Sequence, residues 1–308
     1  MATAAAITTQ RYRSVSPFIG NTPLVKISEQ IYAKLESVNP SGSIKDRMAK
    51  AILDAAEMRG ILKPGGTIIE ATSGNSGIAF SMLSAERGYT MIVVMPNNMS
   101  SERKDMIRAY GATIVEVAAS DFAGAVEKRD ALVAEMGAFC PNQFANNDNV
   151  ECHFMHTGNE ILQQAALIEG KPEISAFVSG TGTGGTLMGI RKALIAKFPR
   201  VKVVAVEPEE SAVMSGGIAN AHSIQGIGDG FIPPIVDMHC VDNIAVISSA
   251  DAIERARRLA KEAGLFVGIS SGANILAAER YINLHKPTGI VVTLLPDRGE
   301  RYLSMMRG

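Results

Sequence analysis

The sequence has few cysteines and almost no net charge. Its three cysteines, Cys140, Cys152 and Cys240, are an odd number without C-x-x-C spacing. This argues against a disulfide framework or a structural zinc site and fits a reducing cytoplasm. With 30 Lys and Arg against 31 Asp and Glu, the net charge of −1 gives no reason to expect nucleic acid or a membrane surface as a partner. We therefore expect a cytoplasmic protein that binds neither.

Two further features are missing. No apolar run reaches the length that spans a bilayer, so no transmembrane helix is expected. The five histidines show no metal-ligand spacing such as H-x-x-x-H, so we assign no metal. What remains is a chain of 308 residues, 46% hydrophobic and 20% charged, which is an ordinary globular composition and long enough for two domains.

Short apolar strands alternate with helical segments along most of the chain. We expect strands at residues 67–70, 90–95, 113–117, 176–179, 201–206, 245–247 and 290–295, helices such as 77–88 and 101–110, and a hairpin from 23–27 and 31–35. This alternation predicts an α/β fold whose parallel sheets are covered by helices on both faces. The pattern alone places a domain boundary near residues 140–150.

The run of residues 39–47, Asn-Pro-Ser-Gly-Ser-Ile-Lys-Asp-Arg, places Lys45 at the start of a helix. Asn-Pro and Ser-Gly favour a turn, and Ser43 with Asp46 forms a capping-box pattern. Unpaired N–H groups and the positive helix end disfavour an ammonium group there, so we expect a lowered pKa for Lys45. Such an amine is a nucleophile of the kind that forms a Schiff base, although most lysines in first turns are simply solvated.

Three loops rich in glycine and hydroxyl groups come before expected helices. Residues 180–186 match G-x-G-x-x-G, and with Glu207 after the next strand they fit a dinucleotide site as well as a tight structural turn. A Walker loop is excluded because Gly-Lys-Ser/Thr is missing. Residues 72–77 suit a carboxylate or ordinary helix capping, and residues 268–274 have the same character. A nicotinamide interpretation leaves Lys45 without a role.

Taken in order, these motifs resemble the cysteine synthase branch of the pyridoxal-phosphate β-family, also called fold type II. The resemblance covers nearly the whole chain, and the segments that carry it are residues 20–24, 39–47, 72–77, 143–144, 182–186, 225–228, 268–272 and 299–304. It implies a two-domain α/β fold like that of tryptophan synthase β, with a smaller domain at residues 38–143 and a larger, cofactor-binding domain from residues 1–37 and 144–308. A homodimer, and docking of a serine acetyltransferase, are also implied.

The resemblance further implies how a cofactor and a substrate are held. Lys45 would hold pyridoxal 5'-phosphate as an internal aldimine and act as general base, Asn75 would bond the ring hydroxyl oxygen, and Ser270 would face the pyridine nitrogen. The phosphate would lie against Gly182, Thr183, Gly184, Gly185 and Thr186, and the substrate carboxylate against Thr72, Ser73, Ser76 and Gln143. A serine does not hold the ring nitrogen protonated, which favours β-replacement over transamination. In the family's main reaction, which we expect here, O-acetyl-L-serine loses acetate and sulfide adds to give L-cysteine.

Asp229 departs from the family pattern, which typically has alanine at that position. A carboxylate there would repel hydrosulfide, yet it could hydrogen-bond a leaving thiol or activate a water as general base. Asp229 therefore raises the alternative of an enzyme that takes L-cysteine to sulfide and L-serine, unless it is a solvent-facing acid without effect. A cystathionine β-synthase-like condensation and serine dehydration are further alternatives. From other classes come an NAD-dependent oxidoreductase and a noncatalytic binding protein.

Overall fold

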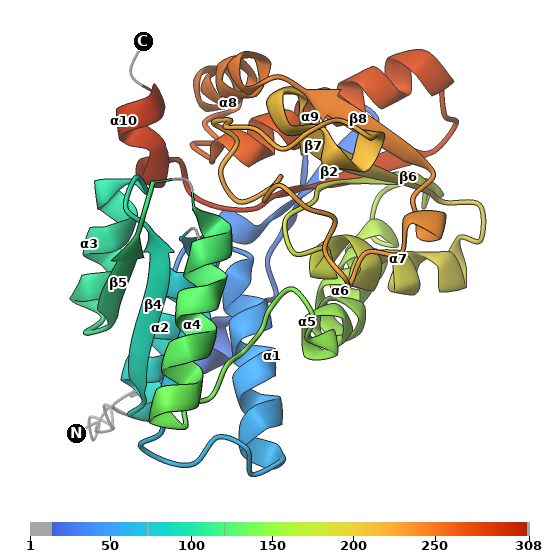
Figure 1. The fold of residues 1–308 in the computed structure, drawn as a ribbon. Coiled ribbons are helices and arrows are strands. Elements are labelled where there is room, and N and C mark those ends of the chain that lie inside the picture. Colours follow the sequence, from blue (N-terminus) through green and yellow to red (C-terminus); the bar gives the residue numbers. More distant parts are fainter. Residues whose placement is uncertain (1–13, 73, 120, 307–308) are drawn as a thin grey trace, which may run out of the picture.

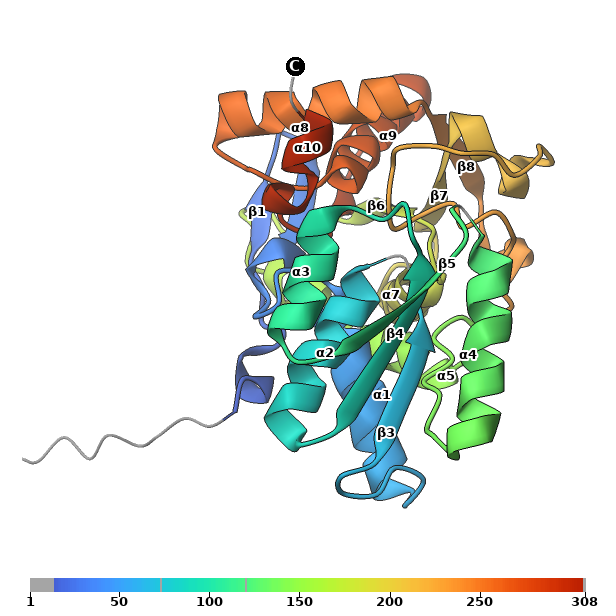
Figure 2. The same ribbon diagram turned by 60° about the vertical axis from the view of Figure 1, so that its left-hand side comes forward.

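The computed structural model describes residues 14–72, 74–119 and 121–306 and arranges them around two separate sheets (Figures 1 and 2). The larger sheet has six strands in the order β1-β2-β9-β6-β7-β8, and the smaller has three in the order β3-β4-β5. Ser73, one of the residues predicted to bind a carboxylate, lies outside the described residues. Among the helices of the described ranges, none is long and apolar enough to cross a membrane.

The larger sheet begins with the hairpin expected from the sequence, in which β1 (Leu24–Lys26) pairs antiparallel with β2 (Ile31–Leu35). All its other pairings are parallel. The parallel strands are β6 (Ile174–Gly180), β7 (Lys202–Pro208), β8 (Asn243–Ile247) and β9 (Ile290–Leu295). Every residue of β9 is buried, as expected for a strand with helices on both faces of its sheet.

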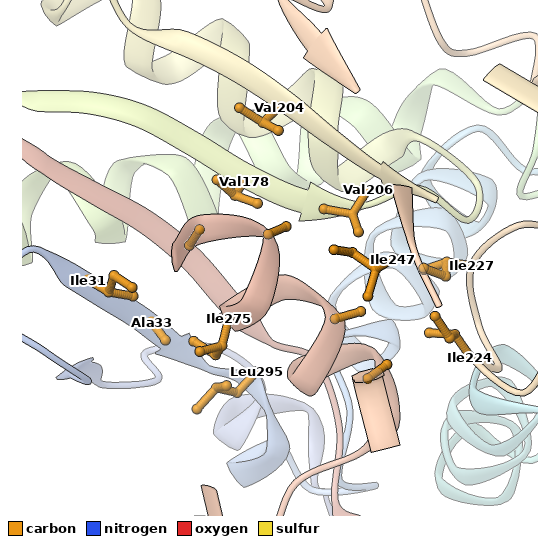
Figure 3. Packing of buried hydrophobic residues seen from close by; sticks show 14 of the residues in the cluster. Ile31, Ala33, Val178, Val204, Val206, Ile224, Ile227, Ile247, Ile275 and Leu295 are labelled. Atoms are coloured by element: carbon orange, nitrogen blue, oxygen red, sulfur yellow. The ribbon is translucent and has the colours of Figure 1, made fainter. Parts of the chain in front are cut away.

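Helices cover both faces of this sheet because successive side chains of its strands point in opposite directions. Val204 and Val206 of β7 belong to the cluster under α8 (Ser249–Ala263) and α9 (Ile269–His285), part of which Figure 3 shows. Val203, one residue away, belongs instead to the cluster under α7 (Gly185–Lys197). The other elements on that side are α5 (Asn147–Cys152), the π-helix η3 (His153–Gly158) and α6 (Asn159–Ala165).

The smaller sheet is entirely parallel, and all of it comes from one stretch of the chain. Its strands are β3 (Thr67–Ala71), β4 (Thr90–Pro96) and β5 (Thr113–Val117). Its helices are α1 (Lys45–Met58), α2 (Asn75–Arg87) and α3 (Ser101–Ala109) around one core, with α4 (Phe122–Met136) over the opposite face. These elements all fall within residues 38–143, which supports our proposal that this range is the smaller domain.

Short helical turns complete the fold, and the last of them returns the chain to the smaller sheet. They are η1 (Ser16–Phe18), η2 (Glu36–Val38), η4 (Glu209–Ser211), η5 (Val213–Ser215), η6 (Met238–Cys240), η7 (Gly299–Tyr302) and α10 (Leu303–Met306). In both views η7 and α10 lie beside α3 (Figures 1 and 2). The seven strands expected from the pattern are all present, with small shifts at their ends.

Candidate active site

A single pocket brings together residues from both sheets at the carboxyl ends of their strands and at the starts of the helices that follow. All the described residues predicted for the site line this pocket, except Gly185. The lining includes Lys45, Thr72, Asn75, Ser76, Gln143, Gly182, Thr183, Gly184, Thr186, Asp229 and Ser270. In an α/β protein this edge of the strands is where ligands bind, because loops and helix N-termini converge there. The sequence motifs therefore meet at one place in the fold.

Lys45 is the first residue of α1 and projects into this pocket. Its pKa is lowered, chiefly because the amine is removed from water, while the nearby carboxylates of Asp229 and Asp297 oppose the effect. The sequence predicted the direction of this shift but attributed it to the helix end, whereas burial is the main cause. A buried amine with a lowered pKa is available as a nucleophile and as a base.

The capping box predicted from Ser43 and Asp46 is wrong. The Asp46 carboxylate accepts hydrogen bonds from the backbone N–H of Ser41, at 2.7 Å, and from the Ser41 hydroxyl. Burial raises the pKa of Asp46 to about 6, although these hydrogen bonds and the charge of Arg301 lower it. Asp46 therefore fixes the turn before Lys45 rather than the helix end itself.

The glycine loop before α7 forms a cradle for an anion. Gly184 is the N-cap of α7 and has a φ of +86°, a left-handed conformation that favours glycine. A Cβ on Gly182 would be forced into the carbonyl oxygen of Gly226, so a larger residue there would push the two loops apart. The unpaired N–H groups at the start of α7 and the hydroxyls of Thr183 and Thr186 complete a site that suits a phosphate group.

Two buried side chains that were not predicted for this site form hydrogen bonds with the threonine hydroxyls of the loop before α7. The Asn149 amide donates to Thr183 Oγ1 at 2.9 Å and to the Gln143 carbonyl at 3.0 Å. His153 Nε2 lies 3.1 Å from Thr186 Oγ1, and its Nδ1 bonds the Thr157 hydroxyl. Burial, helped by the positive charges of Arg47 and Lys45, lowers the pKa of His153 well below its ordinary value and keeps the ring neutral.

The loop before α2 contributes the second anion-binding surface. Ser76, in the first turn of α2, donates to Gln143 Oε1 at 2.5 Å, and Thr72 Oγ1 accepts the backbone N–H of Gly74 at 3.1 Å. Thr72, Ser76 and Gln143 are all buried on the pocket wall. Their hydroxyl and amide groups, together with the N–H groups of the helix start, can bind a carboxylate.

Asn75 is anchored by the C-terminal segment of the chain. Its Nδ2 donates to Asp297 Oδ2 at 2.6 Å, and its Oδ1 accepts from Arg301 Nη1 at 2.5 Å. Asp297 also accepts the Tyr302 hydroxyl, which in turn accepts from Arg103 of α3 at 2.9 Å. The sequence alone gives no role to these anchors, because no local spacing connects residues more than 190 positions apart.

Asp229 lies on the pocket wall and is half-buried, so it is not a purely solvent-facing acid. Its segment is fixed by the Gly228 N–H, which donates to the Thr181 carbonyl at 3.0 Å. Asp229 Oδ2 comes within 3.8 Å of the position that a Cβ on Gly182 would occupy. Burial raises the pKa of Asp229, while Lys45 and His222 act in the opposite direction.

Glu207 does not serve the site that a dinucleotide would need. Its buried carboxylate accepts the backbone N–H groups of Met214, at 2.7 Å, and Ser215, at 2.9 Å, and also the Ser215 hydroxyl. These hydrogen bonds hold η5 in place and occupy the carboxylate, so the interpretation of Glu207 as a ribose-binding acid is wrong. The pocket residues instead fit a phosphate-bearing aldehyde, because an amine, an anion cradle and the buried Ser270 of α9 face one space.

Comparison with known proteins points to the same chemistry. Residues 15–297 match the family described as pyridoxal-phosphate dependent enzymes. A cysteine synthase of Staphylococcus aureus strain N315 is 45% identical over 299 residues, which cover 94% of this chain and 95% of the relative. Among solved structures, a cysteine synthase of Entamoeba histolytica has a TM-score of 0.88 at 38% identity, covering 99% of this chain and 93% of that one.

A second kind of solved structure is equally similar. A hydrogen sulfide-producing enzyme of Fusobacterium nucleatum has a TM-score of 0.90 at 39% identity, covering 96% of this chain and 91% of that one. A variant of that enzyme with Asn in place of an Asp has been solved in complex with an α-aminoacrylate intermediate. The chain is thus similar both to enzymes named for making cysteine and to enzymes named for releasing sulfide.

Proposed function

The chain belongs to the family of pyridoxal-phosphate dependent enzymes, and from that premise we propose that it makes L-cysteine from O-acetyl-L-serine and sulfide. It is a pyridoxal-phosphate enzyme of fold type II that carries out β-replacement in cysteine metabolism. The observation that carries the proposal is the position of Lys45. It shares one pocket with the anion cradle before α7 and with the loop before α2, which can bind a carboxylate. An amino acid and a phosphate-bearing cofactor need these two surfaces on either side of an amine.

The cofactor would be held by residues that already converge on the pocket. Lys45 Nζ would bind its aldehyde carbon, residues 182–186 its phosphate, Asn75 its ring hydroxyl, and Ser270 would face its ring nitrogen. When bound, the cofactor supplies the electron sink that allows a β-substituent to leave. The Ser270 hydroxyl does not keep the ring nitrogen protonated as a carboxylate would, and this favours prompt loss of the leaving group.

The protein's own part in the reaction is orientation and proton transfer. Thr72, Ser76 and Gln143 would bind the substrate carboxylate and turn the α-carbon towards Lys45. Lys45 would take the α-proton as the β-substituent leaves and return it after the nucleophile has added. The lowered pKa of Lys45 suits this role, because a proton shuttle must exist in both protonation states.

Asp229 supports a second candidate function, the release of sulfide from L-cysteine with addition of water to give L-serine. Its carboxylate lies on the pocket wall close enough to affect the pKa of Lys45, and no hydrogen bond from the described residues occupies it. It could therefore accept a proton from an attacking water. The similarity to hydrogen sulfide-producing enzymes favours the same candidate.

A paired product assay tests the two functions. One arm supplies O-acetyl-L-serine with sulfide and measures L-cysteine. The other supplies L-cysteine alone and measures sulfide, L-serine and pyruvate. We expect the first arm to turn over, and Asp229→Asn to reduce serine formation in the second arm by about tenfold or more. The matched control is Asp105→Asn, a substitution of an exposed carboxylate on α3 that should change neither arm.

Turnover in the second arm only, with loss of that turnover in Asp229→Asn, would contradict cysteine synthesis and establish the second function. Equal rates for wild type and Asp229→Asn in both arms would show that Asp229 takes no part in either reaction. Pyruvate as the sole amino-acid-derived product would point to elimination without replacement.

We further infer a homodimer in the cytoplasm, with a serine acetyltransferase as a partner. The family resemblance supports the dimer and the partner. Cys140, Cys152 and Cys240 are all free thiols, which is consistent with a reducing compartment.

A further inference from the structure

A second cavity of about 400 Å³ lies directly outside the pocket; we refer to it as the outer cavity. It is bounded by Asn98 and Met99, which follow β4, and by residues 219–222 and 225–230, which lie between η5 and η6. Phe122, residues 225–227 and Asp229 line both spaces, whereas Lys45 lines only the pocket. A molecule that enters through the outer cavity therefore meets Asp229 before it reaches Lys45.

The described lining of the outer cavity contains an acidic side chain but no lysine or arginine. Among its described lining residues, Asp229 is the only carboxylate, and there is no Lys or Arg. The other titratable group is His222, whose Nε2 lies 2.9 Å from the Gly228 carbonyl oxygen and holds the same segment. The rest of the lining consists of amide, thioether, aromatic and small apolar groups. An anion in this space would face a carboxylate without a compensating arginine or lysine on the walls.

The Asp229 carboxylate is also free to take part in chemistry. The titratable groups that act on it are Lys45, from the pocket side, and the imidazole of His222, from the outer side. No described residue donates a hydrogen bond to its oxygens, whereas the backbone around it is fixed by Gly228 and Thr181. The Asp229 side chain thus lies at the junction of the two spaces, and hydrogen bonds fix the backbone next to it. In this position its carboxylate can accept a proton.

We propose that the outer cavity admits the second substrate as an uncharged or cationic nucleophile that carries a hydrogen, and that Asp229 receives this hydrogen as a proton. The inference rests on the proposed β-replacement and adds the class of its nucleophile. A lone pair of the nucleophile forms the bond to the β-carbon, its bond to hydrogen breaks, and the proton passes to an Asp229 oxygen. The α-carbon then takes a proton from Lys45.

This class includes hydrogen sulfide, water and small neutral or basic thiols. It disfavours amino-acid nucleophiles, because their own carboxylate would enter a cavity that offers no Lys or Arg among its described lining residues. The proposal therefore separates simple β-replacement from a cystathionine-type condensation on the basis of charge.

Three thiols of similar size and different charge test the proposal: 2-mercaptoethylamine, 2-mercaptoethanol and thioglycolate. With saturating O-acetyl-L-serine, kcat/KM for thioether formation is measured for each thiol by mass spectrometry. We expect thioglycolate to be at least about tenfold below 2-mercaptoethanol, and Asp229→Asn to bring the two within about threefold. The Asp105→Asn control should keep the wild-type ratio, because this carboxylate is exposed on α3 and lies outside both spaces.

A gain-of-function variant and unreactive analogues separate binding from nucleophilic strength. Ala219→Lys adds a cation at an exposed position on the wall of the outer cavity, and it should raise the ratio of thioglycolate to 2-mercaptoethanol by about threefold or more. The S-methyl derivatives of the three thiols cannot react, so their inhibition constants against 2-mercaptoethanol report binding alone. The methylated thioglycolate should be the weakest inhibitor of the wild type and should improve in Ala219→Lys.

Failure of the proposed function and failure of this inference give different results. If O-acetyl-L-serine yields no product with any nucleophile, including sulfide, cysteine synthesis is wrong; the same series with L-cysteine as donor, scored by sulfide release, still tests charge selection. Thioglycolate reacting as well as 2-mercaptoethanol in the wild type, or a ratio that neither Asp229→Asn nor Ala219→Lys changes, would overturn the inference.

Discussion

The pocket has two walls that are built in different ways. The cofactor wall, residues 182–186 with the start of α9, consists of glycines and hydroxyls at helix starts, and buried Asn149 and His153 hold its threonines. The outer wall, residues 225–230, belongs to no helix or strand and presents Asp229 without a hydrogen bond from the described residues. The first wall suits an anion such as a phosphate group, whereas the second carries the carboxylate on which our two candidate functions differ.

Backbone contacts join the two walls. The Gly228 N–H donates to the Thr181 carbonyl, and the Gly226 carbonyl lies against Gly182. Because these contacts involve only main-chain atoms, the residue at position 229 can change without breaking the connection.

The largest effect should come from Lys45, which faces both walls. Lys45→Ala should remove the visible absorption of lysine-bound cofactor and lower turnover by about 10³-fold or more in both arms of the product assay, because the shuttle for the α-proton is lost. The control is Lys50→Ala, a substitution of a partly exposed lysine on the same helix. Residual turnover within tenfold of the wild type would contradict the role of Lys45 in either reaction.

A smaller effect should follow from forcing the walls apart. Gly182→Ala would push a methyl group into the Gly226 carbonyl, so we expect the dissociation constant for pyridoxal phosphate to rise by about tenfold or more, as measured by fluorescence titration of the apoenzyme. Gly216→Ala is the control: its φ of +85° strains the backbone, but open space surrounds it. It should lower the free energy of unfolding by about 1 kcal/mol without changing cofactor affinity. Equal loss of affinity in both variants would mean that contact between the walls is unimportant.

The sequence predicted the cofactor wall better than it predicted the outer wall and the anchors. Glycine loops at helix starts are local features, and the reason for them is also local, because a positive helix end and a close backbone approach need only a few adjacent residues. The order of strands and helices was predictable for the same reason, since hydrophobic periodicity is read within each segment.

Contacts between distant segments could not be predicted. Asp297 and Arg301 bind Asn75 from the far end of the chain, and His153 reaches Thr186 from a π-helix that no periodicity announces. The capping box failed because Asp46 found Ser41 as a partner, and Glu207 was misread because its partners come from a turn after the strand. In each case the sequence identified a residue able to form hydrogen bonds but not the partner.

The smallest effect is expected at His153, which supports the cofactor wall behind Thr186, and it tests whether this buried imidazole is neutral. His153 is 1% exposed and its pKa is lowered, so the stability it contributes is fully present above its unfolded pKa of about 6.5 and is lost as pH falls below that value. At pH 5.5 the wild type should have lost about 1 kcal/mol of unfolding free energy that His153→Gln does not lose, as measured by urea titration at pH 7.5 and 5.5. Asp46, whose raised pKa of about 6 acts in the opposite sense, is common to both proteins and cancels in the difference. The control His239→Gln, at an exposed position, should follow the wild type, and equal pH dependence in all three proteins would mean that folding does not lower the pKa of the His153 imidazole.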